Sequence, residues 1–99
     1  MTLPITLFGA MDCDDTQRTR ACLIKRGIQF CEINIDHEPD AERFVIYINA
    51  GFRSTPTLVI GGGKIKIILT EPDDTQLDEV LASAQHFQNL FTPYLQGGK

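Results

Sequence analysis

The sequence predicts an α/β domain built on a four-stranded mixed β-sheet with helices on both faces. Three observations lead to this prediction. Short apolar or alternating segments suit strands, longer amphipathic segments suit helices, and glycine or proline stands where one kind of segment gives way to the next. The resulting order is β-α-β-α-β-β-α. Strands joined through a helix should be parallel with a right-handed crossover, and the last two strands should form an antiparallel hairpin.

The first strand is expected at residues 5–8, ITLF, and Gly9 closes it. A helix follows over about residues 14–26, with aspartates at its start and basic residues at its end, as the helix dipole favours. Gly27 is a natural stop for this helix. Residues 28–36 then suit a second strand, because apolar and polar side chains alternate along them.

A second helix is expected over residues 39–49, since its first residue is a proline and apolar side chains recur at helical spacing. Residues 57–60 and 64–69 suit the third and fourth strands, which a flexible glycine loop joins as a hairpin. The last helix is expected to begin at Asp73, which with Gln76 three residues later resembles a capping box.

The 99 residues suit one small domain, expected over residues 1–84, followed by a C-terminal extension over residues 85–99 that is partly helical or disordered. Three apolar side chains of the extension are available to pack on the domain or on a second copy: Phe87, Leu90 and Phe91. We therefore expect a monomer or a weak dimer.

Composition and charge exclude several classes of function. Nine Lys and Arg against thirteen Asp and Glu give a net charge of -4, which argues against nucleic-acid or anionic-membrane partners. There is no apolar run of about 18 residues and no secretory signal pattern, so we expect a cytoplasmic protein that does not cross a membrane. Three cysteines without a C-x-x-C pair argue against a disulfide framework, and no histidine or cysteine spacing indicates a bound metal.

Cys13 stands where the first strand gives way to the first helix, a position that suits a reactive thiol. The free N–H groups and the dipole of a helix N-terminus stabilise a thiolate. Asp12, Asp14 and Asp15 oppose this, because neighbouring negative charges raise the pKa of a thiol. Together the three carboxylates can cancel the help of the helix, and we expect a slow thiol with a pKa nearer that of free cysteine than that of an activated catalytic thiol. Thr16, one helical turn later, can hydrogen-bond the sulfur.

The other two cysteines are expected in the core. Cys22 lies nine residues along the same helix, about 13 Å from Cys13 at 1.5 Å per residue, which is too far for a disulfide. Cys31 shares a predicted strand face with Ile33 and Ile35, although pairing between two chains is an alternative.

Four segments carry a family resemblance: ITLFG before the cysteine, RGIQFCEINID in the second strand, NAGFRSTPTLVI around the third, and LTEPDDTQL before the last helix. In this order and spacing they resemble the glutaredoxin-like proteins of the thioredoxin fold, including the mycoredoxin and NrdH-redoxin branch. The resemblance covers about residues 4–84. The family's active site is Cys-x-x-Cys or Cys-x-x-Ser. Here it is Cys13-Asp14-Asp15-Thr16, so Cys13 aligns with the nucleophile and Thr16 replaces the resolving residue.

The resemblance implies a thiol–disulfide oxidoreductase that works by a monothiol route on protein or small-molecule disulfides. Glutathione or another low-molecular-weight thiol is the implied co-substrate, and no tightly bound cofactor is expected. A glutathione-bridged iron–sulfur cluster is a weaker alternative. The resemblance also implies a cis proline that faces the cysteine, beside a backbone that binds an extended substrate. The implied substrate- or thiol-binding residues are Thr55, Pro56, Asp73 and Asp74. Independently of the resemblance, the guanidinium of Arg53 is the candidate partner for a carboxylate of the thiol ligand or substrate, and a merely solvated side chain is the alternative. For Asp73, helix capping alone is a sufficient explanation.

Two other hypotheses remain open. The first is a catalytically degenerate thioredoxin-fold module that binds a partner through the groove between Cys13 and Pro56. The second is an arsenate-reductase-like or Spx-like protein, because CDDTQRTRACLIKRGI resembles the cysteine helix of those families. The chain lacks the helical insertion that they carry between their second and third strands.

Overall fold

The computed structural model describes residues 4–62 and 65–83 and contains the predicted elements in the predicted order. Its four strands are β1 (Ile5–Gly9), β2 (Cys31–Asn34), β3 (Thr57–Gly62) and β4 (Ile65–Thr70). They lie in the sheet order β2-β1-β3-β4. The β1–β2 pair is parallel, whereas the β1–β3 and β3–β4 pairs are antiparallel. The mixed sheet is therefore confirmed, while the predicted extension over residues 85–99 lies outside the described residues.

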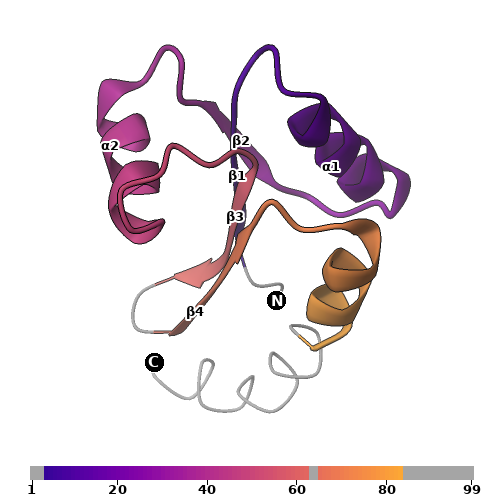
Figure 1. Ribbon diagram of the computed structural model, residues 1–99. Helices are drawn as coiled ribbons and strands as arrows, with labels where there is room; N and C mark the ends of the chain where they lie inside the picture. The colour runs from indigo at the N-terminus through magenta and orange to yellow at the C-terminus, as the bar shows by residue number, and fades with distance from the viewer. Residues whose placement is uncertain (1–3, 63–64, 84–99) are drawn as a thin grey trace.

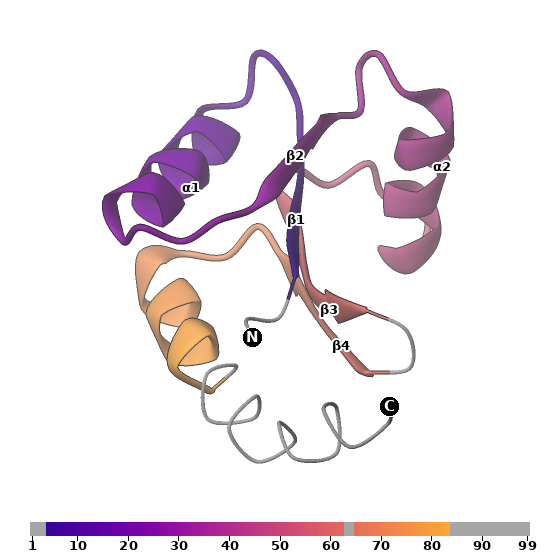
Figure 2. The same ribbon diagram turned by 180° about the vertical axis from the view of Figure 1, so that it is seen from behind.

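Helices cover both faces of the sheet, as predicted (Figures 1 and 2). Helix α1 (Asp14–Lys25) and the helical residues 74–83 lie on one face, and α2 (Pro39–Ile48) lies on the other. No helix among the described residues is long and apolar enough to span a membrane.

Two apolar clusters, one on each face of the sheet, form the core. Between the sheet and the α1 side lie Leu7, Leu23, Leu58, Ile60 and Leu77, and between the sheet and α2 lie Phe8, Ile35, Val45 and Val59. Along each of β1 and β3, successive side chains point into opposite clusters. This is the period-two pattern of a sheet that is covered on both sides. Each fully buried leucine contributes about 1.5–3 kcal/mol to folding.

Two helix ends confirm the local signals in the sequence. At the end of α1, Gly27 has φ +69°, and its N–H donates to Ile24 while the N–H of Ile28 donates to Leu23. This pair of hydrogen bonds is the Schellman motif, which favours glycine. At the start of the last helix, Asp73 and Gln76 exchange backbone-to-side-chain hydrogen bonds of 2.8 and 3.0 Å, as the predicted capping box requires.

Predictions about two of the strands were wrong. The second strand covers only Cys31–Asn34, and Cys31 is exposed instead of buried. The reason is that β2 is an edge strand, and the cluster under α2 includes Ile33 and Ile35 but not Cys31. The third strand extends through Gly62 into the predicted glycine loop, because strand pairing needs only backbone groups. Cys22 was also expected in the core. Its side chain is half-buried and packs against the apolar cluster between the sheet and α1.

Candidate active site

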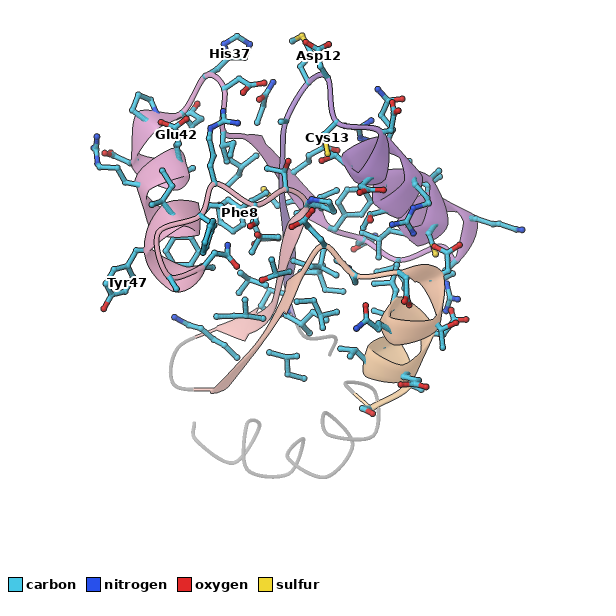
Figure 3. The ribbon with its side chains drawn as sticks, in the orientation of Figure 1. Phe8, Asp12, Cys13, His37, Glu42 and Tyr47 are labelled. Atoms are coloured by element: carbon cyan, nitrogen blue, oxygen red, sulfur yellow. The ribbon has the colours of Figure 1, made fainter. Side chains whose placement is uncertain are left out.

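Three segments far apart in sequence meet at one end of the sheet. In the parallel β1–β2 pair, Gly9 lies opposite Asn34, so the residues after each strand leave the sheet side by side. In the antiparallel β1–β3 pair, Phe8 lies opposite Thr57, so the residues before β3 reach the same end. Residues 10–13, 35–37 and 53–56 therefore converge there. Figure 3 shows Asp12, Cys13 and His37 at this end of the molecule.

Cys13 is the N-cap residue of α1, with an extended backbone and a half-buried side chain. Its thiol donates a hydrogen bond to the carbonyl oxygen of Thr55, with an Sγ···O distance of 3.5 Å. The Thr55–Pro56 peptide bond is cis, and Pro56 is buried. Three of the predicted site residues, from two distant segments, thus lie together.

Thr16 lies on the buried side of the same helical turn and is completely inaccessible to solvent. Its hydroxyl oxygen accepts a hydrogen bond from the Ala10 N–H at 3.5 Å, so the hydroxyl hydrogen is left for the sulfur of Cys13. The Thr16 methyl group packs on the backbone of Gly9, where an added Cβ would lie 2.3 Å from it. Only glycine, which has no Cβ, allows this close approach at position 9. The sequence predicted that Gly9 ends the strand but not that it makes room for Thr16.

The Cys13 thiol has a lowered pKa. Burial raises the pKa, but hydrogen bonds from the side chains of Thr16 and Thr55 and from the backbone N–H groups of Thr16 and Asp15 outweigh it. The direction of this shift is opposite to the effect of the three aspartates, while the expectation of a slow thiol stays a prediction. Asp12, Asp14 and Asp15 are exposed to water, which screens their charges, whereas the N–H groups of the first turn of α1 favour the thiolate.

Arg53, expected to bind a carboxylate of the substrate, is held by carboxylates of its own chain. Its Nε donates to Glu42 Oε2 at 2.6 Å, and its Nη2 donates to Asp36 Oδ1 at 2.5 Å. The other oxygen of Asp36 accepts the Met11 N–H at 2.9 Å. Sequence reasoning missed Asp36 and Glu42. The only signal available was that Asp36 follows a strand that is parallel to β1, so that both strands end at the same edge.

Asp73 and Asp74 make structural contacts. The Asp73 carboxylate accepts the Gln76 N–H of the capping box. Asp74 accepts a hydrogen bond from Arg18 Nη1 at 2.6 Å, and Arg18 also donates to the Pro72 carbonyl oxygen at 3.0 Å. Arg18 thereby ties α1 to the start of the last helix. Over residues 4–62 and 65–83, no cluster of three or more side chains suited to a metal ion is found.

Comparison with known protein families matches residues 5–65 to the glutaredoxin family. This match includes Cys13, Thr16 and the Thr55–Pro56 peptide bond. Comparison with curated proteins gives no match.

Three solved structures resemble the chain over most of its length. NrdH-redoxin from Escherichia coli is 25% identical, with a TM-score of 0.56 over 76% of this chain and 92% of its own. A glutaredoxin from Archaeoglobus fulgidus is 22% identical, with a TM-score of 0.60 over 80% and 86% of the two chains. Mitochondrial thioredoxin 3 from Saccharomyces cerevisiae is 20% identical, with a TM-score of 0.57 over 82% and 77%. The last two likenesses concern the fold alone.

Proposed function

This chain belongs to the glutaredoxin family, and from that premise we propose that it is a thiol–disulfide oxidoreductase acting by a monothiol route through Cys13. The observation that carries the proposal is the environment of the Cys13 sulfur. It lies at a helix N-terminus, beside Thr55 and the cis Pro56, and its pKa is lowered. A thiol must be ionised to attack a disulfide, so this environment favours the reaction.

In the first step, the Cys13 thiolate attacks one sulfur of a mixed disulfide between a protein and a small thiol. The disulfide breaks, the protein sulfur leaves and takes up a proton, and the small thiol remains bonded to Cys13. In the second step, a second small thiolate attacks that bond and releases Cys13. The mixed disulfide is thereby reduced: the protein regains its thiol, and the small thiol taken from it leaves as a disulfide with the second small thiol.

Thr16 and Thr55 have separate roles in this proposal. The Thr16 hydroxyl, with the N–H groups of the first turn, stabilises negative charge on Cys13 when it attacks and when it leaves. Thr55 offers its backbone to an extended substrate segment beside the sulfur. Because Thr16 has no thiol, release of Cys13 depends on an external thiol, and we propose that turnover is slow. Glutathione or another low-molecular-weight thiol supplies the electrons, which suits a reducing compartment such as the cytoplasm.

The experiment is to incubate the protein with a peptide–glutathione mixed disulfide and free glutathione, following peptide release and the adduct on each cysteine by mass spectrometry. We expect an adduct on Cys13 and catalysed release. Cys13→Ser should abolish both, while the exposed Cys31→Ser should abolish neither. Release that survives Cys13→Ser would contradict the proposal.

A second candidate is a binding module without turnover. The internal ion pairs of Arg53 favour it, because they occupy the side chain expected to bind the substrate carboxylate. An unmodified Cys13 together with measurable binding of the peptide would support this candidate. The glutaredoxin match favours both readings over an arsenate-reductase-like protein.

A further inference from the structure

We propose that Asp36 is a positioning residue of this site, whose carboxylate ties the loop that carries Cys13 to the loop that carries Thr55. The inference rests on the proposed function, because it assigns Asp36 the task of holding the thiol against the substrate-binding backbone. Asp36 touches neither the sulfur nor the expected substrate position, and it acts through Met11 and Arg53.

The strand register places Asp36 beside the Cys13 loop. Gly9 lies opposite Asn34, and the Ile35 N–H donates to the Gly9 carbonyl oxygen at 2.9 Å, which continues the parallel pairing past both strands. Met11 comes two residues after Gly9, and Asp36 comes two residues after Asn34, so the two residues lie beside each other past the ends of the strands. The Asp36 backbone is itself fixed, since its N–H donates to the Asn34 side chain at 2.9 Å.

Each oxygen of the Asp36 carboxylate has a different partner. Oδ2 accepts the N–H of Met11, two residues before Cys13, at 2.9 Å. Oδ1 accepts Nη2 of Arg53, two residues before Thr55, at 2.5 Å. One side chain therefore bridges the two segments whose meeting creates the Cys13–Thr55 contact. Hydrogen bonds to a charged carboxylate are shorter and stronger than those between neutral groups.

The Arg53 end of this bridge is anchored on α2. Its Nε donates to Glu42 Oε2 at 2.6 Å, so the planar guanidinium is held on two sides. The charged groups that face Asp36 are Arg53 and, less closely, His37. The Met11 N–H and Arg53 lower the pKa of Asp36, so its carboxylate is ionised at neutral pH.

A positioning role and a simple charge effect predict opposite results. If Asp36 acted on Cys13 only as a nearby negative charge, its removal would lower the pKa of the thiol. If it positions the loop, its removal lets the Cys13 segment move away from its hydrogen-bond donors, and the pKa of the thiol rises. Ion pairs that are this exposed contribute little to overall stability, so the effect should appear at the thiol and not in folding.

The test is the pH dependence of alkylation at Cys13, read on the Cys13 peptide by mass spectrometry, for the wild type, Asp36→Ala and Asp36→Asn. We expect Asp36→Ala to raise the pKa of Cys13 and to slow its alkylation at neutral pH by about threefold to tenfold, since one pKa unit is tenfold in thiolate. Asp36→Asn keeps one acceptor but loses the charged bridge, and a smaller change in the same direction is expected. Asp12→Asn is the control, because it also removes one negative charge near the thiol but leaves the bridge intact. It should leave the pKa of Cys13 unchanged or lower it.

A pKa that falls or stays constant in both Asp36 variants would overturn the inference. Circular dichroism checks that each variant is folded, and Asp36→Asn decides the question if Asp36→Ala does not fold. Alkylation requires no turnover, so this result is independent of whether the protein reduces disulfides. The absence of peptide release in the experiment above would contradict the proposed function alone.

Discussion

The Cys13 sulfur lies 3.5 Å from the carbonyl oxygen of Thr55, 42 residues away in the sequence. The contact follows from the sheet, because antiparallel pairing of β1 and β3 brings the residues after β1 to those before β3. The thiol is therefore placed by backbone pairing and tuned by the first turn of α1.

Gly9→Ala tests the space that Thr16 requires. The added Cβ would lie 2.3 Å from the Thr16 methyl group, so the helix start must shift. We expect a loss of about 1–3 kcal/mol in the free energy of unfolding, as for other overpacked sites. Urea denaturation measures this loss. Gly62→Ala is the matched control, because its Cβ would meet Pro4 at an ordinary 3.9 Å, and we expect a change within about 1 kcal/mol. Equal losses in the two variants would contradict the account.

Thr16→Val tests the hydrogen bond from the hydroxyl to the sulfur. Valine keeps the shape of the side chain but has no donor, so the pKa of Cys13 should rise by about half a unit to one unit. Thiolate absorbance, taken as the difference from Cys13→Ser, measures the pKa. Thr16→Ser keeps the hydroxyl and should stay closer to the wild type. The account fails here if valine and serine give the same value.

Asp73→Ala separates helix capping from ligand binding. Loss of the capping box should lower the free energy of unfolding by about 0.5–2 kcal/mol. If capping is its whole role, the concentration dependence of the reaction on glutathione should not change. Asp40→Ala, an exposed substitution on α2, serves as the stability control and should cost less than about 0.5 kcal/mol. A large change in glutathione dependence would restore Asp73 as a binding residue.

The lowered pKa of Cys13 predicts how stability depends on pH. Since the folded pKa lies below the unfolded value, the unfolded state binds more protons between the two, and stability rises with pH in that interval. The contribution of the Cys13 thiolate to the free energy of unfolding is complete above the unfolded pKa of about 8.5. It is lost as the pH falls through the pKa of Cys13 in the folded protein. Denaturation of the wild type and Cys13→Ser at several pH values should show a difference that grows toward pH 8.5 in favour of the wild type. A difference that is constant or shrinks would indicate the opposite shift.

Much of the fold could be predicted because its signals are local. Glycine at position 27 needs only its own helix end to act as a stop, and Asp73 with Gln76 forms a capping box within four residues. The exposure of Cys31 could not be predicted in this way. Its strand face was correct, but burial depends on how far α2 extends over an edge strand.

The site was predictable in its residues and less so in its energetics. Cys13, Thr16 and the Thr55–Pro56 peptide bond follow from the family's motif. The partners of Arg53 required the register of β1 with β2, which places Asp36 at the Cys13 loop. The direction of the Cys13 pKa shift required knowing that the aspartates face water while the backbone N–H groups face the sulfur.

The central claim is that the protein makes Cys13 more acidic than a free cysteine. The most direct measurement is the rate of Cys13 alkylation against pH, with Cys13→Ser to assign the signal. The account predicts a midpoint below the free-cysteine value of about 8.5. A midpoint at or above that value would contradict it and would favour a protein that keeps the fold and binds a partner without using the thiol.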